Sequence, residues 1–293
     1  VKISNAQELH QIRDNPSGDY VLVDNIDLSG IDNFEPIENF TGTFDGNGHT
    51  ISNLTIDRPE TDGVGLFLSV RDDTRLFGLI GDEGTIKNVR LENANVTGSR
   101  FVGSLVGANM GTVTEVSTIG EVRGDETVGG LVGQNEGIVR KSRASNHVSG
   151  DSILGGLVGW NYGEVTESYS MSDVSGGTTV GGLVGVNNPI PKTEGTVVGS
   201  YATGEISGEG TDGLIAQTVR GEIISSYWDV NSTGQMSSAG GTGLKTEEMT
   251  GSAGRDNMEG FDFDETWETV TNPDDYPRLV WQAEAEDKME MAE

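Results

Sequence analysis

The residues best suited to chemistry form a series that recurs at a constant step of 26 residues. Its members are Asn95, Glu121, His147, Asp173 and, after an insertion, Glu205. If equivalent positions of successive repeats lie above one another, about 4.8 Å apart, His147 stands between two carboxylates. A histidine in that setting could bind a metal or exchange protons with a substrate. The alternative, and the commoner arrangement, is a solvated ladder in which His147 offsets the repulsion between like charges.

A second candidate site is a short sequence similar to the start of a calcium-binding loop. It consists of Asp229, Asn231 and Thr233, followed by Gly234. In such loops alternate positions supply oxygen ligands, and a glutamate at the twelfth position completes the coordination. The twelfth position here is Gly240. We therefore predict that no cofactor is bound, and calcium at these residues is the alternative.

Two aromatic residues form the candidate ligand-binding site. Trp160 and Tyr162 flank Asn161 at positions where the other repeats carry small, aliphatic or polar side chains. Aromatic rings at an exposed corner can stack on sugar rings, and this predicts a glycan contact. The alternative is that both rings pack on a neighbouring corner of the same fold.

The elements that must position these residues are set by the repeat itself. Between Phe101 and Gly185, a phrase of Gly or Ser followed by Leu, Val and Gly returns at the same step, with its leucines at Leu105, Leu131, Leu157 and Leu183. A fixed period of this length is typical of solenoids, in which each unit buries its apolar face against its neighbours. Glycine interrupts every apolar run, and Val, Ile, Thr and Ser dominate between the glycines. This composition favours short strands over helices.

We therefore predict an all-β fold, a parallel β-helix with about 26 residues per coil. Leucine and valine columns fill its interior, and glycine occupies corners that need positive φ or a close approach of backbone. The asparagines of the repeat are expected to form an amide ladder, side chain bonded to side chain: Asn109, Asn135, Asn161 and Asn187. A further column alternates in charge, which reduces repulsion between coils: Glu115, Lys141 and Glu167.

The chain divides into four predicted segments. They are an N-terminal cap (1–30), the coils (31–225) with insertions near 57–75 and 188–194, a C-terminal cap (226–281) and an acidic tail or linker (282–293). Helical spacing from Ala6 to Arg13, behind a possible cap at Asn5, predicts a helix over the first coil. The aromatic residues of the C-terminal cap are expected to seal the far end.

Composition restricts the partners and the environment. The 293 residues carry 47 acidic and 18 basic side chains, and the net charge is −29. In ordinary saline such a surface repels nucleic acid and itself, whereas at molar salt the screening length falls to about 3 Å. We therefore predict a protein adapted to high salt, from a halophilic organism. The alternative is an acidic secreted protein loaded with calcium. The chain has no Cys and no apolar run long enough to span a membrane, so we expect neither disulfides nor membrane insertion.

Two phrases carry a resemblance to a known family. GGLVGQNEG from Gly129 to Gly137 and GGLVGWNYG from Gly155 to Gly163 resemble the GLUG motif. The resemblance implies a right-handed β-helix on secreted or cell-surface proteins, including adhesins and the non-catalytic regions of some immunoglobulin A peptidases. It implies structural motif positions and no catalytic residues. The zinc motif of those peptidases is missing, because no histidine of this chain is followed by Glu. The acidity suggests a haloarchaeal relative.

The functional expectation is a non-catalytic, surface-exposed β-helix module of a larger adhesin, cell-envelope or appendage protein. It would act in adhesion or as a structural spacer, outside the cell, on the cell surface or on a virion. Its partners would be a cell-surface glycan or protein, or neighbouring subunits. Because the chain starts without Met, we expect a mature or excised portion of something longer. The alternative is a carbohydrate-binding or carbohydrate-cleaving β-helix such as a virus tail spike.

Overall fold

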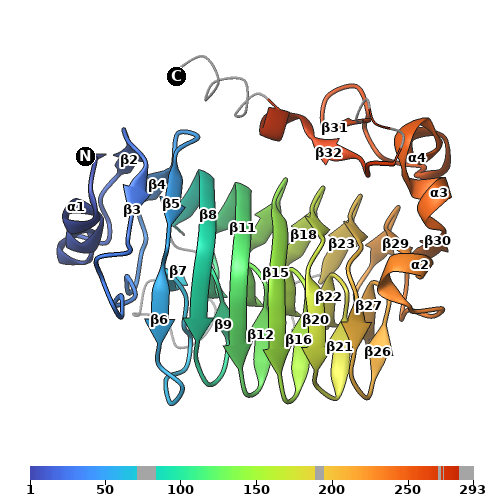
Figure 1. The fold of residues 1–293 in the computed structure, drawn as a ribbon, viewed down its shortest axis with the longest axis horizontal. Coiled ribbons are helices and arrows are strands. Elements are labelled where there is room, and N and C mark those ends of the chain that lie inside the picture. The colour runs from blue at the N-terminus through green and yellow to red at the C-terminus, as the bar shows by residue number, and fades with distance from the viewer. Residues whose placement is uncertain (71–83, 189–194, 270–271, 273, 284–293) are drawn as a thin grey trace.

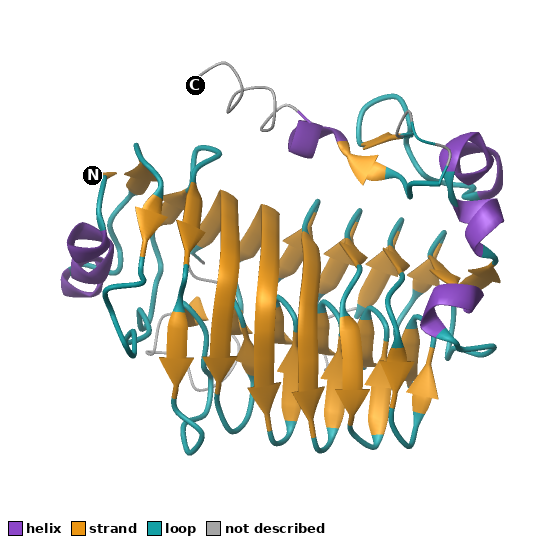
Figure 2. Ribbon diagram, viewed as in Figure 1, coloured by secondary structure: helices purple, strands orange, loops and turns teal. Residues whose placement is uncertain are grey.

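The computed structural model describes residues 1–70, 84–188, 195–269, 272 and 274–283. Within these ranges the chain is built mainly of strands that pair in parallel and stack along one axis (Figure 1). Helices occur only toward the two ends of the described chain (Figure 2). The predicted all-β class with parallel sheets is confirmed.

One repeat shows how the chain turns. β13 (Val132–Asn135) lies in a six-stranded sheet, β14 (Ile138–Arg140) and β15 (Arg143–Gly150) lie in a large sheet, and β16 (Ile153–Gly155) lies in a five-stranded sheet. The chain then returns to the six-stranded sheet as β17 (Val158–Asn161), directly beside β13. Asn135 pairs with Asn161, 26 residues later. The pairing register therefore follows the step of the sequence, in a β-helix-like fold.

The described strands fall into four sheets. The large sheet has 19 strands. Besides β14 and β15 it holds β1 (Lys2–Ile3), β2 (Tyr20–Leu22), β3 (Ile26–Asp27), β4 (Thr43–Asp45), β5 (Thr50–Ser52), β6 (Thr55–Asp57), β8 (Thr85–Thr97), β11 (Thr112–Gly124), β18 (Glu164–Thr166), β19 (Tyr169–Ser170), β20 (Asp173–Gly176), β23 (Thr196–Val198), β24 (Tyr201–Ala202), β25 (Ile206–Ser207), β28 (Ile223–Ile224), β29 (Tyr227–Asp229) and β30 (Thr242–Leu244).

The smaller sheets complete each turn. The six-stranded sheet adds β7 (Phe67–Val70), β10 (Val106–Asn109), β22 (Val184–Asn187) and β27 (Ile215–Thr218) to β13 and β17. The five-stranded sheet adds β9 (Val102–Gly103), β12 (Thr127–Gly129), β21 (Thr179–Gly181) and β26 (Thr211–Asp212) to β16. An antiparallel pair, β31 (Trp267–Glu268) and β32 (Arg278–Leu279), lies beside the stack.

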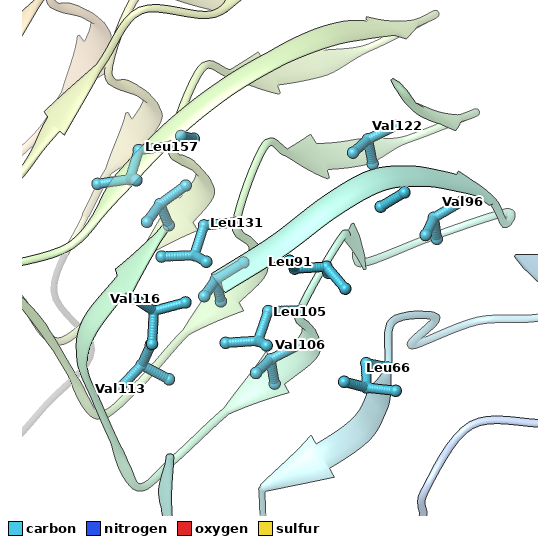
Figure 3. Close-up of a cluster of buried hydrophobic side chains, with 14 of the residues drawn as sticks. Leu66, Leu91, Val96, Leu105, Val106, Val113, Val116, Val122, Leu131 and Leu157 are labelled. Atoms are coloured by element: carbon cyan, nitrogen blue, oxygen red, sulfur yellow. The ribbon is translucent and has the colours of Figure 1, made fainter. Parts of the chain in front are cut away.

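Columns of aliphatic side chains fill the space between the sheets. Leu105, Leu131 and Leu157 are fully buried, one above the other, with valines from the facing strands around them (Figure 3). Each such side chain contributes about 1.5–3 kcal/mol when it is fully removed from water. Because every coil adds the same few residues, a low overall hydrophobic content is enough for a continuous core.

Two backbone positions of the regular coils restrict the residue type: one is occupied by glycine and the other by charged residues. A Cβ at Gly129 would lie 2.0 Å from the Val132 carbonyl oxygen, so this position requires glycine. The bend inside the large sheet has positive φ, and there the structure differs from the expectation of glycine. Glu115, Lys141 and Glu167 occupy it, with φ of 56°, 47° and 48°.

The N-terminal segment contains the expected helix in two parts. α1 (Ala6–His10) is capped by Asn5, whose side chain accepts a hydrogen bond from Glu8 N at 3.0 Å, and a 3-10 turn (Gln11–Asp14) follows. Leu9 and Ile12 are fully buried in the main core. The helix α1 lies at one end of the stack, beside the first strands (Figure 1).

The predicted insertion near 57–75 is wrong in part. β7 lies inside that interval and pairs with β10, placing Phe67 beside Val106. The sequence Gly65-Leu66-Phe67 is therefore one more copy of the repeated phrase, with phenylalanine in place of valine. The remainder of this insertion, from residue 71, lies outside the described residues. In the second predicted insertion only Asn188 is described, and its backbone N–H donates to the Asn161 carbonyl at 3.0 Å.

Of the aromatic residues in the predicted C-terminal cap, only Trp228 lies where the prediction placed it, at the far end of the described coils. That end is covered by Trp228, which belongs to the main core and donates from Nε1 to the Gln235 carbonyl at 3.0 Å. Close to this end lie α2 (Val230–Thr233), α3 (Thr246–Met249) and α4 (Gly251–Asn257) (Figure 1). The later aromatic residues instead pack on the outer side of the coils, because three tyrosines stand there in successive coils: Tyr169, Tyr201 and Tyr227.

The boundary predicted at residue 282 is also displaced. Gln282 is buried, and its side chain accepts hydrogen bonds from the Tyr169 hydroxyl at 2.9 Å and from Leu279 N at 3.0 Å. Gln282 therefore belongs to the packed segment and not to a tail. The rest of the predicted tail, residues 284–293, lies outside the described residues.

Candidate functional site

The two aromatic residues singled out in the sequence form a stacked pair on the outside of the coils. Trp160 is in β17 and Tyr162 follows two positions later, so both point to one side while Asn161 points inward. Their ring centroids are 5.3 Å apart and their planes are inclined by 20°. Both side chains are partly buried. The arrangement gives one coil an aromatic surface at a corner.

Polar groups of the preceding coil lie beside these rings. Trp160 is paired in register with Gln134, whose Nε2 donates to Glu136 Oε1 at 2.6 Å. Burial, and then the negative charge of Glu136, raise the pKa of the Tyr162 hydroxyl. Tyr162 therefore stays protonated and remains a hydrogen-bond donor at neutral pH. The indole Nε1 of Trp160 is enclosed and has no partner among the described groups.

The four asparagines of the repeat lie beneath this corner. All are fully buried, and Nδ2 of Asn109, Asn135 and Asn161 each donates at 2.8 Å to Oδ1 of the next asparagine. The last, Asn187, donates to the Gly195 carbonyl at 2.7 Å. The structure therefore brings all four predicted ladder residues together. Their amide groups satisfy one another and backbone carbonyls, which is a structural role.

The calcium-like sequence is brought together as a helix cap. Asp229 is fully buried, and its Oδ1 accepts hydrogen bonds from Asn231 N at 2.7 Å and Ser232 N at 3.2 Å. Its Oδ2 accepts from the Thr246 hydroxyl at 2.7 Å and from the Tyr276 hydroxyl. Donors from the protein thus occupy both carboxylate oxygens and tie α2 to α3.

Thr233 also serves the backbone, because its hydroxyl donates to the Asp229 carbonyl at 2.6 Å. No group of three or more His, Asp or Glu side chains that could hold a metal ion was found in the described parts of the chain.

The histidine series lies in one line, as the register predicts. Strand pairing places Glu121 beside both Asn95 and His147, and His147 beside Asp173. Glu205 follows through its backbone N–H, which donates to Asp173 Oδ1 at 2.9 Å. All five side chains are exposed on the large sheet. This placement matches a solvated ladder, because nothing encloses the imidazole.

The column of alternating charge lies at the positive-φ bend. Lys141 Nζ is 3.8 Å from Glu167 Oε2, and the Thr266 hydroxyl donates to Glu167 Oε1 at 3.4 Å. The Lys141 carbonyl accepts a hydrogen bond from Trp281 Nε1 at 2.7 Å. These residues therefore help to hold the C-terminal segment on the coils.

The tyrosine column under that segment was not predicted. Tyr169 and Tyr201 stack with centroids 4.8 Å apart and planes inclined by 7°, and Tyr227 follows in the next coil. The Tyr201 hydroxyl donates to the Pro277 carbonyl at 2.7 Å and that of Tyr227 to the Glu259 carbonyl at 2.8 Å. A signal was present in the sequence, since a Ser-Tyr pair occurs in each of these three coils.

Comparisons with known proteins give two partial relatives. Halomucin of Haloquadratum walsbyi is 42% identical over 116 residues, which are 35% of this chain and 1% of halomucin. A protein named as a Gly-rich membrane protein, from Evansella cellulosilytica, is 32% identical over 110 residues, covering 33% of this chain and 12% of that protein. The chain thus spans a small fraction of the length of either relative. No protein-family model matches it.

Solved structures share the fold at low sequence identity. A candidate immunoglobulin A1 protease from Bacteroides ovatus superposes with a TM-score of 0.66 at 20% identity, over 96% of this chain and 92% of that one. An IgA1 protease gives a TM-score of 0.52 at 17% identity, over 78% of this chain and 19% of that one. No helix in the described residues is long and apolar enough to cross a membrane. The chain is therefore similar to a segment of halomucin and has a fold found in these larger proteins.

Proposed function

We propose that this chain is a non-catalytic, surface-exposed module of a larger cell-surface protein of a halophilic organism, acting in adhesion or as a structural spacer. The observation that carries the proposal is the 42% identity to a segment amounting to 1% of halomucin. The matched segment is therefore a small part of a much longer protein. The proposal includes a right-handed β-helix of the GLUG type.

The use of the buried polar groups supports a structural module. The ladder asparagines donate to one another, and the buried Asp229 carboxylate accepts hydrogen bonds from donors of the protein on both oxygens. The one histidine series is exposed. A catalytic acid or base works best enclosed, where burial and neighbouring charges adjust its pKa. These groups instead stabilise the coils.

The net charge supports a high-salt environment. With −29 on 293 residues, repulsion across the surface is strong at low ionic strength and is screened within about 3 Å at molar salt. The carboxylates then serve mainly to keep the surface hydrated. We propose that the partners are cell-surface glycans or proteins, or neighbouring subunits of the same assembly.

Surface labelling tests the proposal. Antibodies raised against this chain should label intact cells of the organism that encodes it, and proteolysis of intact cells should remove the label. Antibodies against a cytoplasmic enzyme, as a control, should label only permeabilised cells. Label confined to permeabilised cells would overturn the surface assignment.

A second assay tests the absence of catalysis. The purified chain should release neither reducing ends from polysaccharides nor fragments from immunoglobulin A in molar salt. Release of either product, at a rate that scales with the amount of protein and disappears on heating, would overturn the non-catalytic assignment.

A further inference from the structure

We propose that the stacked rings of Trp160 and Tyr162, with Gln134 and Glu136 beside them, bind an oligosaccharide of neutral hexose or N-acetylhexosamine units. This deepens the part of the proposed function that names cell-surface glycans among the partners, on which it rests, and it identifies the class of glycan and the residues that bind it. Failure of the glycan test would leave the surface assignment standing, and the reverse also holds.

The fold does not require aromatic residues at these positions. In the column of Trp160, strand pairing places Ala108, Gln134, Val186 and Gln217 in the other coils. Those coils have the same register and the same asparagine ladder without a large ring. One coil alone therefore carries the aromatic pair, which is the pattern of a local site and not of a structural repeat.

The rings also show a feature that stability alone does not explain. Trp160 Nε1 is enclosed with no partner in the part of the chain that the structure describes. Enclosed, unpaired donors are rare in folded proteins because they lose their hydrogen bond to water. Valine at this position in the next coil avoids that loss. Selection for stability would favour such a residue, so the indole has a role other than stability, and we assign that role to the partly exposed ring face, since the N–H itself is enclosed.

The groups around the rings match the two faces of a sugar. Aromatic faces pack against the C–H groups of a pyranose ring, and amphipathic aromatic side chains suit surfaces that are partly apolar and partly wet. The Glu136 carboxylate and Gln134 amide offer an acceptor and a donor for hydroxyl groups within the neighbouring coil. The Tyr162 hydroxyl adds a second donor, and burial together with Glu136 raises its pKa, so it stays protonated even at mildly alkaline pH.

Charge selects among the sugars. Glu136 lies at the site, and the whole chain carries −29. Uronic acids, sialic acids and sulfated sugars would be repelled at ordinary ionic strength. At molar salt, charge recognition is screened within about 3 Å, whereas stacking and short hydrogen bonds persist. The occupant is therefore a neutral sugar, held in the same way at low and high salt.

The test is direct binding of defined oligosaccharides to the whole chain. Chitohexaose and cellohexaose serve as neutral probes and hexagalacturonate as the acidic one, each titrated by calorimetry at low and molar salt. We expect saturable binding of a neutral probe, with an affinity that changes little with salt. Trp160→Ala and Tyr162→Ala should each weaken it by about tenfold, and Trp160→Phe by less. Gln217→Ala, in the same column at the last coil, is the matched control and should bind like the wild type.

Three results would overturn the proposal. They are no saturable binding of either neutral probe, unchanged affinity in Trp160→Ala, or preference for hexagalacturonate. Should an alanine variant fail to fold, a measurement on the wild-type chain still tests whether the sugar binds at Trp160. The indole N–H resonance of Trp160, assigned by its loss in Trp160→Phe, should shift when a neutral probe binds. An unshifted resonance would reject the site.

Discussion

Asparagine has two roles in this molecule, and burial separates them. The ladder asparagines are fully buried and donate to one another through their amides. Others adopt the left-handed conformation at bends, among them Asn53, Asn88 and Asn93, with φ of 59°, 53° and 53°. Asparagine tolerates this conformation better than most residues. Glu115 takes the position of Asn88 in the following coil and therefore stores strain there.

Removing one ladder member should destabilise the fold strongly. In Asn135→Ala the Asn109 amide loses its acceptor at 2.8 Å, and the Gly137 and Glu164 carbonyls lose a donor. Each buried polar group left unpaired costs about 1–3 kcal/mol, so we expect the free energy of unfolding to fall by about 3 kcal/mol or more in urea denaturation. The matched control Asn95→Ala, at an exposed position, should change it by less than about 0.5 kcal/mol. Equal losses in both variants would contradict the ladder's role.

Relieving the backbone strain at the bend should raise the free energy of unfolding, whereas removing a ladder asparagine lowers it. Glu115→Gly removes a Cβ at φ of 56°, and we expect stabilisation of about 1 kcal/mol because glycine adopts this conformation without penalty. Glu121→Gly, in an ordinary strand position of the same β11, should destabilise by about 0.5–1 kcal/mol. Thermal unfolding of the two variants beside the wild type measures both. A loss of stability in Glu115→Gly would show that its side chain has a contact more important than the strain.

At the scale of elements, the described residues 258–269 and 274–283 form a strap that packs along the outer side of the coils. Its aromatic side chains pack on the tyrosine column in a cluster separate from the main core. Trp267 is nearly fully buried and packs against both rings of the stacked pair Tyr169 and Tyr201, with ring centroids 5.9 and 5.6 Å away. At its end, Trp281 and Gln282 reach Lys141 and Tyr169. The strap thus ties together coils that are distant in sequence.

Truncating the central ring should release the strap without unfolding the sheets. We expect Trp267→Ala to cost about 3–5 kcal/mol of local stability, because it leaves a cavity beside the stacked tyrosines where the indole packed. Limited proteolysis should then cut residues 255–280 while the coils stay intact, and hydrogen exchange should rise over the same residues. Phe263→Ala, at the partly buried margin of the cluster, serves as the control with a smaller effect. Global unfolding of Trp267→Ala would mean that strap and coils form one cooperative unit.

Alkaline pH should also loosen the strap. Burial, followed by the hydrogen bond to Asp229, raises the pKa of Tyr276 to about 12, and burial raises the pKa of Tyr169 and Tyr201 as well. The folded state therefore holds protons that the unfolded chain releases near pH 10. Stability is complete below pH 10 and is lost as the pH rises toward 12.

Tyrosinate absorbance and far-UV circular dichroism, followed together, measure this transition. Tyr276, and the coil tyrosines Tyr169 and Tyr201 that the strap covers, should ionise as the strap is released, before the β signal is lost. Tyr162→Phe, which lies outside the cluster, should leave the transition unchanged. Ionisation of all tyrosines near pH 10 with the fold intact would contradict the burial of the column.

The constant step of the repeat made the coils predictable. The first copy of the repeated phrase and the packing of the C-terminal segment were not predicted. Leu131 and Val132 recur at a fixed step, and the step fixes the register directly. The first copy of the phrase was missed because Phe67 replaces valine and residues follow it that the other coils lack. The strap was missed because its contacts, such as Tyr169 with Gln282, join residues 113 positions apart. No local pattern encodes a packing partner at that distance, and an aromatic cluster suits an end cap as well as an outer face.

For the candidate site, the sequence identified Trp160 and Tyr162 by contrast with the other coils. Their mutual stacking, and the Gln134–Glu136 pair beside them, required the structure. At Asp229 the sequence pattern was misleading. Its spacing predicted a cation site, and the donors that occupy its oxygens come from Thr246 and Tyr276, too far along the chain for spacing to reveal.

At the scale of the whole molecule, charge sets the conditions under which the coils are stable. The described ion pairs are few and mostly exposed, so most carboxylates of the net −29 remain uncompensated. Exposed pairs contribute little in any case. Self-repulsion is therefore expected to limit stability in dilute buffer.

Stability should accordingly rise with ionic strength. Between about 0.1 M and about 1 M salt the screening length falls from roughly 10 Å to roughly 3 Å, and we expect the melting temperature to increase by at least about 5 °C. NaCl and KCl should act alike, because screening depends on ionic strength. No increase produced by either salt would contradict the electrostatic cause.

The strap also decides how the molecule carries tension. Because Gln282 rests against Tyr169 and the backbone beyond Trp267 returns along the coils, a pull at Gln282 loads the strap before it reaches any strand of the stack. The C-terminal segment would then detach from Tyr169, Tyr201 and Tyr227 in turn, and each step would lengthen the chain and absorb work. We therefore expect a load applied at Gln282 to detach the C-terminal segment first and to leave the parallel strands of the coils paired.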